Sequence, residues 1–381
     1  MKKWLGIALL AIAGVAMAQD NNKLTIKGQL DGFGDTILIY RAEVGMEKLP
    51  PDTVLANDGK IDCKISLDKP QWLYLANPQL VRGDETNGRG TRLIGVPNET
   101  AIFTPVVGNI YHIGGSQFYT SYSEAKASLD SANIMATRAE IEFNNRVAKG
   151  ENPDDVKREL RPRINAAFQY SKTALFDYVK NHPDNEASAA IIYLLDDLDE
   201  MEKAVSLLSD RVKNGRMKRI YTLALDAERK AIEEDKEREK LQSAGIEAPD
   251  FTLNDIQGKP LSLSSLRGKY VVLDFWGSWC GWCIKGMPQM KEYYAKYKGK
   301  FEIVGIDCND TEEKWKAAVA KYELPWIHVY HPQGADVCQK YGISGFPTKI
   351  IIGPDGKIVE TIVGEDPAFY ASLDKILGSQ Q

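Results

Sequence analysis

Two cysteines separated by two residues follow a run of apolar residues in the C-terminal third of this 381-residue chain. The run is Val271–Phe275, and the two cysteines are Cys280 and Cys283. This position, between an expected strand and an expected helix, suits dithiol chemistry because the unpaired N–H groups of a first helical turn stabilise a thiolate. The second sulfur then lies one turn away, where it can resolve a mixed disulfide. The spacing therefore predicts a redox-active dithiol on an α/β scaffold.

Zinc sites use the same cysteine spacing, but a structural zinc site needs a second pair of ligands. The histidines of the chain are His112, His182, His328 and His331, and they supply no such pair. His328 and His331 are only three residues apart, but we expect them to face different ways, one in a strand and one in a loop. We therefore expect no metal site.

The first 18 residues have the features of a secretory signal peptide. Lys2 and Lys3 precede an apolar stretch, Trp4–Val15, and Ala16–Ala18 forms a small-x-small cleavage site. The stretch is shorter than the ~20 residues of a membrane span, which argues against the alternative of an uncleaved anchor. No cysteine lies near the cleavage site, so lipid attachment is not expected. The sequence predicts export to the periplasm or cell envelope, an oxidising space in which thiols need a dedicated reductant.

The composition excludes two other classes of protein. Lys and Arg total 48 against 53 Asp and Glu, which gives a net charge of -5 and no sign of a nucleic-acid-binding surface. Five cysteines are too few for a disulfide framework in a chain of this length. Cys63 alternates with Ile61 and Ile65, so we expect a buried, inert thiol there. Cys308 and Cys338 could pair with each other, although we favour two unpaired, part-buried thiols.

Hydrophobic periodicity divides the mature chain into three regions. Residues 19–120 consist of short β-branched and aromatic runs separated by turn signals, which predicts an all-β, sandwich-like domain. Residues 121–245 change to apolar side chains spaced three and four apart, which predicts a helical region. One apolar stripe of this kind joins Ile191 to Leu208. Residues 246–381 alternate strand and helix patterns, which predicts an α/β fold with both faces of its sheet covered.

The motifs around the dithiol resemble the two signatures of the thioredoxin superfamily. They read Phe275-Trp276-x-x-Trp279-Cys280-x-x-Cys283 and Tyr341-Gly342-Ile343-Ser344-Gly345-Phe346-Pro347-Thr348. The lead-in Ala248-Pro249-Asp250-Phe251, with Gly258-Lys259 after it, is similar to that of envelope thiol–disulfide oxidoreductases of the TlpA/ResA type. The resemblance covers residues 246–381. The two preceding regions resemble the N-terminal parts of some exported TlpA-like proteins.

The resemblance implies specific roles at the dithiol. Cys280 would be the exposed nucleophile that attacks a substrate disulfide, and Cys283 would be the recessed resolving thiol. Pro347 would be a cis-proline facing the dithiol, and Phe346 would offer its backbone to an incoming peptide.

Three tryptophans complete the expected site. Trp276 and Trp279 would flank the dithiol, although plain aromatic packing explains Trp276 equally well. Trp279 and Trp282 are the two that we expect to contact a substrate.

Asp274 lies six residues before Cys280 in an otherwise apolar strand, at a position where thioredoxin itself has an acid. We expect its carboxyl to be buried, with a raised pKa, and to accept the proton of Cys283. The alternative is a side chain that reaches solvent or a neighbouring lysine.

Two departures from the subfamily pattern affect the expected chemistry. Many members have a glutamate two residues before the helix proline, where this chain has Gly286. The Gly-Trp dipeptide between the cysteines also lacks the imidazole of strongly oxidising relatives. Without that cation the thiolate is less stabilised and the dithiol more reducing, which favours a reductase.

The sequence therefore predicts an exported disulfide reductase with no cofactor beyond its Cys280–Cys283 disulfide. Electrons would come from a membrane transporter of thiol equivalents and pass to oxidised protein substrates, an apocytochrome c among them as in several relatives. A thiol peroxidase is a weaker alternative, because peroxiredoxins need proline and Thr or Ser where this chain has Leu273 and Gly277. A binding protein is the other alternative, in which residues 24–243 recruit a client or cell-wall ligand and the dithiol is auxiliary.

Overall fold

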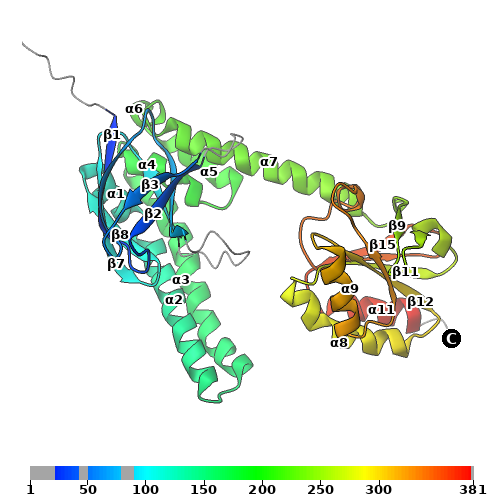
Figure 1. Cartoon of the computed structure of the whole chain (residues 1–381). Coiled ribbons are helices and arrows are strands. Elements are labelled where there is room, and N and C mark those ends of the chain that lie inside the picture. Colours follow the sequence, from blue (N-terminus) through cyan, green and yellow to red (C-terminus); the bar gives the residue numbers. More distant parts are fainter. Residues whose placement is uncertain (1–21, 43–49, 79–89, 379–381) are drawn as a thin grey trace, which may run out of the picture. The chain divides into compact units, whose positions relative to one another are not determined.

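The computed structural model describes residues 22–42, 50–78 and 90–378, which form two compact units (Figure 1). Unit 1 extends to Arg229 and unit 2 begins at Lys230, so the division falls inside one helix, α7 (Lys218–Gln242). The expected signal peptide, residues 1–18, lies outside the described residues. No helix in the described ranges combines the length and the apolar composition that a membrane crossing requires.

Unit 1 contains two four-stranded sheets among its described residues, with strand orders β4-β1-β7-β8 and β3-β2-β5-β6. All neighbouring strands are antiparallel except β1 and β7, which are parallel. Inward-facing residues of both sheets, such as Ile26 and Ile39, belong to one hydrophobic cluster, so the sheets form the expected sandwich. The strands are β1 (Lys23–Gln29), β2 (Thr36–Ala42), β3 (Asp52–Leu55), β4 (Lys60–Ser66), β5 (Gln71–Ala76), β6 (Gly90–Gly95), β7 (Thr100–Val107) and β8 (Ile110–Gly115).

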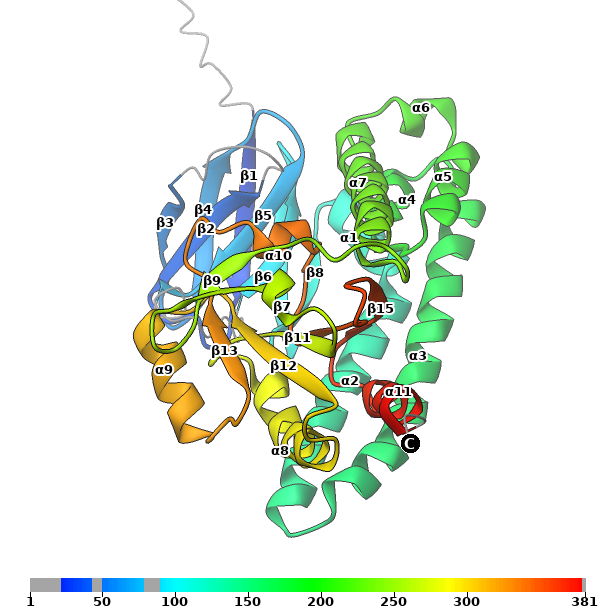
Figure 2. The same cartoon turned by 90° about the vertical axis from the view of Figure 1, so that its right-hand side faces the viewer.

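The helices of unit 1 share a core with its sheets. Tyr119, Val179 and Met201 belong to the same hydrophobic cluster as the strand residues, so the β and helical regions bury their apolar side chains together. Two long helices, α2 and α3, lie side by side as a hairpin (Figure 1 and Figure 2). The helices before α7 are α1 (Gln117–Ala125), α2 (Ala127–Ala148), α3 (Pro153–Asn181), α4 (Glu186–Ala190), α5 (Leu198–Leu207) and α6 (Asp210–Lys213), with a 3₁₀ turn, η2 (Ile192–Leu194).

The apolar stripe from Ile191 to Leu208 does not form one continuous helix. Leu195 has extended backbone with ψ 139°, which separates η2 from α5. Asp197 then caps α5, because its carboxylate accepts a hydrogen bond of 2.9 Å from the N–H of Glu200. The capping side chain starts a new helix, and the spacing of apolar residues does not reveal it.

Unit 2 contains a five-stranded sheet of order β13-β12-β11-β14-β15. The first three strands are parallel, and β14 and β15 are antiparallel to their neighbours. A short hairpin precedes this sheet. The strands are β9 (Thr252–Asn254), β10 (Pro260–Ser262), β11 (Tyr270–Trp276), β12 (Phe301–Asp307), β13 (Ile327–Tyr330), β14 (Thr348–Ile352) and β15 (Ile358–Val363).

Hydrophobic clusters cover both faces of this sheet, as the alternation of strands and helices predicts. One cluster includes Met287, Trp315 and Phe369 from three helices, and the other includes Leu253 and Val337. The fold is therefore the α/β, thioredoxin-like fold expected for this region. Its helices are α8 (Gly281–Lys296), α9 (Glu312–Lys321), α10 (Val337–Lys340) and α11 (Ala368–Gly378), with a 3₁₀ turn, η3 (Leu263–Leu266).

Candidate functional site

The dithiol lies where the central strand of the sheet meets a helix. β11 is bordered by β12 and β14, which fixes the position of its carboxyl end. Cys280 is the N-cap of α8, and its Sγ accepts a hydrogen bond of 3.1 Å from the N–H of Cys283. Unpaired backbone N–H groups of a first helical turn favour negative charge, so this position stabilises a thiolate on Cys280.

Cys280 and Cys283 form a disulfide, so the structure represents the oxidised form of this site. The sequence predicts an exposed nucleophile and a recessed resolving thiol. In the oxidised form both residues are buried instead, with 6% of Cys280 and 4% of Cys283 exposed. The covalent bond holds the two sulfurs together against one hydrophobic cluster, which also includes Trp276 and Met287.

The expected tryptophans differ sharply in exposure. Trp276 is 1% exposed and packs in the core, so of the two alternatives for this residue the structure favours plain aromatic packing. Trp279 and Trp282 are 53% and 64% exposed. The Trp279 indole N–H donates a hydrogen bond of 3.1 Å to the carbonyl oxygen of Cys308, which fixes the ring. Both exposed rings belong to the segment that carries the disulfide, and Lys285 Nζ lies 4.5 Å from the centre of the Trp282 ring.

The second signature lies at the same end of the sheet. Thr348 begins β14 and pairs with Phe275 of β11, which brings the preceding loop to the strand end that leads into the dithiol. The Phe346–Pro347 peptide bond is cis, as predicted. The Phe346 ring lies 5.3 Å from the Trp279 ring, edge to face. The contact of Phe346 and Pro347 with a substrate remains a prediction.

Asp274 is a buried carboxyl on the face of the sheet that carries the dithiol. Val272 and Trp276, two residues before and after it, belong to the cluster that holds both cysteines, and side chains alternate along a strand. Burial raises the pKa of Asp274 to about 6, against the smaller lowering effect of Lys349. Lys349 Nζ lies 3.9 Å from Asp274 Oδ1, too far for a hydrogen bond. The carboxyl therefore titrates closer to neutral pH than an exposed aspartate does.

Glu365 is a second acid at this site, and the sequence analysis did not identify it. It follows β15, and its carboxylate accepts hydrogen bonds from Lys349 Nζ at 2.8 Å and from the Tyr370 hydroxyl at 3.0 Å. A Cβ atom at Gly286 would lie 2.3 Å from this carboxylate. Glu365 therefore occupies the space beside α8 that Gly286 leaves open. Only the tertiary fold brings these distant positions together, so no local sequence signal indicates their contact.

Two further buried polar side chains lie near the sheet. Neither carboxylate oxygen of Asp307 has a hydrogen-bond partner within the described part of the chain, and burial raises the pKa of this residue to about 8. Burial lowers the pKa of His328 to about 3, so its imidazole is neutral at pH 7. His331, in contrast, lies beside Cys338, so the two histidines face different ways, as predicted.

Cys63 is a free thiol in β4, half-buried against the core of unit 1. Cys63 is therefore less buried than predicted, but burial still raises its pKa to about 11, as an inert thiol requires.

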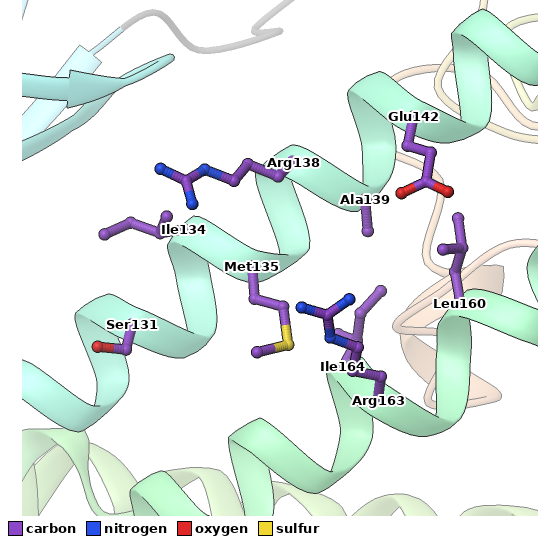
Figure 3. Close-up of a pocket in the computed structure, with 9 residues that line it drawn as sticks. All are labelled: Ser131, Ile134, Met135, Arg138, Ala139, Glu142, Leu160, Arg163 and Ile164. Carbon is purple, nitrogen blue, oxygen red and sulfur yellow. The ribbon is translucent and has the colours of Figure 1, made fainter.

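A cavity of about 350 Å³ lies between α2 and α3 in unit 1 (Figure 3). Its lining combines apolar side chains with two guanidinium groups and one carboxylate, from Ser131, Ile134, Met135, Arg138, Ala139, Glu142, Leu160, Arg163 and Ile164. It contains no cysteine or histidine, so its lining offers no thiol chemistry.

The sequence of unit 2 is similar to those of known proteins. Residues 244–361 match the AhpC/TSA family. The thiol-disulfide oxidoreductase ResA of Bacillus cereus is 43% identical over 130 residues, which are 34% of this chain and 74% of that protein. ResA of Bacillus subtilis is 35% identical over 123 residues, which are 32% of this chain and 68% of that protein. Among solved structures, the thioredoxin domain of a thiol-disulfide oxidoreductase from Bacteroides vulgatus is 35% identical. The match covers 35% of this chain and 98% of that domain, with a TM-score of 0.34.

Proposed function

Because this chain belongs to the ResA family of thiol–disulfide oxidoreductases, we propose that it is an exported disulfide reductase whose reactive groups are Cys280 and Cys283. The family establishes the class of enzyme, which exchanges thiols and disulfides. One observation supports the choice of residues above all others. The Cys280–Cys283 disulfide caps α8 at the end of the central strand, where a thiolate is stabilised.

The proposed reaction begins with the reduced enzyme. The Cys280 thiolate attacks one sulfur of a substrate disulfide, forming a mixed disulfide and releasing the other substrate sulfur, which takes up a proton. Cys283 loses its proton to Asp274 and attacks Sγ of Cys280. This step releases the second substrate thiol and forms the Cys280–Cys283 disulfide. Two electrons pass from the enzyme to the substrate in each cycle.

Side chains around the dithiol support each step. The N–H of Cys283 donates to Sγ of Cys280, and hydrogen bonds of this kind stabilise the attacking thiolate. The raised pKa of Asp274, about 6, makes its carboxylate a competent base at neutral pH. Lys349 lies between the carboxylates of Asp274 and Glu365 and offsets part of their charge.

We further propose that oxidised proteins are the substrates. The exposed rings of Trp279 and Trp282 provide an apolar surface for an unfolded segment, and the backbone of Phe346, before cis-Pro347, would pair with it. An apocytochrome c has the required chemistry, since it carries two nearby cysteines that must be reduced. No cofactor other than the dithiol takes part in this scheme.

Export determines the source of electrons in this proposal. The signal-peptide features of residues 1–18 direct the chain to the periplasm or cell envelope, where no soluble reductant maintains thiols. A membrane transporter of thiol equivalents would then reduce the Cys280–Cys283 disulfide after each turnover.

Insulin reduction by the full mature chain tests the proposed activity. We expect wild-type protein to reduce insulin disulfides when a dithiol is supplied, and Cys280→Ser to abolish this reaction. Cys63→Ser is the matched control, because this thiol lies in unit 1 and is inert, and it should leave the rate unchanged. Equal rates for wild type and Cys280→Ser would contradict the proposal.

A trapping experiment identifies the substrates. Cys283→Ala removes the resolving thiol, so mixed disulfides between Cys280 and client proteins should accumulate in cells. Non-reducing gels and mass spectrometry should then recover exported proteins with paired cysteines. Recovery of none, with Cys280 unmodified, would favour the alternative of a binding protein with an auxiliary dithiol.

A further inference from the structure

Three metal-binding side chains from separate elements meet in unit 2, outside the dithiol site. Cys308 follows β12, His331 follows β13, and Cys338 lies on α10. One ligand atom from each lies within 4.8 Å of the other two. We propose that Cys308, His331 and Cys338 bind one thiophilic d¹⁰ metal ion, Zn²⁺ or Cu⁺. Two thiolates and one imidazole are ligands that both ions accept.

The backbone fixes the relative positions of these ligands. Asp307 and Tyr330 are paired residues at the ends of β12 and β13, so the residues that follow them, Cys308 and His331, leave the sheet side by side. The N–H of His331 donates a hydrogen bond of 3.0 Å to the carbonyl oxygen of Asp307. The backbone N–H of Cys338 donates a hydrogen bond of 3.5 Å to Nε2 of His331, which holds the imidazole beside Cys338.

The distance between the two sulfurs is compatible with a metal site. Sγ of Cys308 and Sγ of Cys338 lie 3.2 Å apart. Two thiolates on a tetrahedral Zn²⁺, with Zn–S bonds of about 2.3 Å, lie roughly 3.8 Å apart, so the sulfurs need to separate by only about half an ångström. A disulfide would instead require them to approach to about 2.05 Å. A disulfide also gives no role to His331, the third member of the cluster.

The cluster is also accessible from one side. Cys308 is fully buried, whereas His331 and Cys338 are half-buried, so an ion can enter from their side.

The site is independent of the dithiol but adjoins the loop that leads to it. Cys308 belongs to the hydrophobic cluster on one face of the sheet, and Cys280 and Cys283 belong to the cluster on the other. The carbonyl oxygen of Cys308 accepts the hydrogen bond from Trp279. Metal binding should therefore stabilise unit 2 and change Trp279 fluorescence without using the catalytic cysteines.

The test uses the full mature chain with Cys280→Ser and Cys283→Ser, so that the dithiol cannot bind metal. After reduction with a phosphine under anaerobic conditions, the protein is titrated with Zn²⁺, with Co²⁺ as a spectroscopic probe, and in a separate arm with Cu⁺ against a chelator. We expect one ion per chain and a cobalt–thiolate charge-transfer band. The two arms show which of the two ions the site accepts.

Variants of the proposed ligands decide the assignment. In the same background, Cys338→Ser should abolish the band. His331→Ala should weaken binding by about tenfold or more, since even the loss of a group that only hydrogen-bonds to a metal ligand lowers metal affinity ~10–100-fold. Cys63→Ser and His112→Ala are the matched controls, and both should bind as the parent does. Circular dichroism checks the fold of each variant. If Cys338→Ser does not fold, the metal affinities of His331→Ala and His331→Gln test the assignment in its place.

Three results would overturn the proposal. One is metal binding by Cys338→Ser or His331→Ala with the affinity of the parent, and another is no binding by the parent in either arm. The third is a Cys308–Cys338 disulfide that forms in the presence of equimolar metal, detected as an intact mass lower by two hydrogens. That third result would make the cluster a thiol pair with His331 only as its neighbour.

Discussion

The carboxylate of Glu365 occupies the space that a side chain at position 286 would need, since a Cβ atom there would lie 2.3–2.4 Å from its atoms. Glycine inside a helix is unfavourable by roughly 0.5–1 kcal/mol relative to alanine, so helix propensity does not explain Gly286. Space for Glu365 does. The protein thus keeps an acid beside α8 although the helix itself carries none at this position.

We predict that Glu365→Gln lowers the pKa of Asp274 below its value of about 6, because the negative charge of Glu365 raises it. Lys349 would then interact with Asp274 alone, which lowers this pKa further. The acid limb of the pH–rate profile for insulin reduction should therefore move to lower pH. An unchanged acid limb would show that Glu365 has only a packing role.

A relocation of the acid provides a second prediction. Gly286→Ala should displace the Glu365 carboxylate and reproduce the shift of Glu365→Gln. The double variant Gly286→Glu/Glu365→Ala places the acid where many relatives have it, and it should restore a wild-type pH–rate profile. If the double variant behaves like Gly286→Ala, the position of the carboxylate matters and not only its presence.

Asp274→Asn should slow disulfide reduction near pH 7 by ~10²-fold, the lower end of the usual contribution of a general base. Glu313→Gln, an exposed carboxylate on α9, is the control and should keep the wild-type rate. The measurement is insulin reduction over pH 6–9, with circular dichroism to confirm the fold. Equal rates for Asp274→Asn and wild type over this range would make the carboxylate structural.

The same residue predicts a pH dependence of stability in the oxidised form. Its pKa is about 6 in the folded chain against 3.8 ordinarily, so the folded state binds more protons between these values. The contribution of Asp274 to the free energy of unfolding is fully present below pH ~4 and is lost as the pH rises through 6. It amounts to ~3 kcal/mol in total. Urea unfolding gives the free energy of unfolding of wild type and of Asp274→Asn at each pH. The difference between them, wild type minus variant, should therefore fall across this window and stay constant above pH ~7. His328, with its lowered pKa, has the opposite slope but cancels in the difference.

Unit 2 was the most predictable part of the fold. The strands and helices expected to alternate over residues 246–381 do so in the structure, as α9 and β13 illustrate, because strong hydrophobic periodicity agrees with tertiary packing there. The apolar stripe from Ile191 to Leu208 did not reveal the break between η2 and α5, where the side chain of Asp197 caps a new helix. The parallel pairing of β1 with β7 joins distant residues, and no local pattern indicates it.

The site shows the same division between local and long-range information. Cys280, Cys283 and the cis bond before Pro347 follow from contiguous motifs. Glu365 reaches Gly286 only because the fold brings the segment after β15 beside α8. His331 is likewise uninformative until β12 and β13 pair and bring it to Cys308, which is why the sequence predicted no metal site.

Export makes a prediction about the mature N-terminus. Cleavage should follow Ala18, because Ala16-Met17-Ala18 provides the small residues that signal peptidase requires. Intact-mass analysis of protein purified from the envelope should show a chain that begins at Gln19, in the fraction released by a salt wash. Retention of Met1, or partition with membranes after that wash, would contradict cleavage.

The last prediction concerns the redox potential of the Cys280–Cys283 couple. Glycine and tryptophan separate the cysteines, so neither intervening residue is a cation that stabilises the reduced form. We therefore expect a potential near the ~-270 mV of thioredoxin and far from the ~-120 mV of the strongest envelope oxidant. For a two-electron couple, the difference between these two potentials corresponds to a free energy of roughly 7 kcal/mol. Trp279 and Trp282 lie beside the dithiol, so their fluorescence should report a titration with dithiothreitol or glutathione. A midpoint above about -180 mV, the level of protein disulfide isomerase, would rule out the reductase and indicate an oxidase or isomerase.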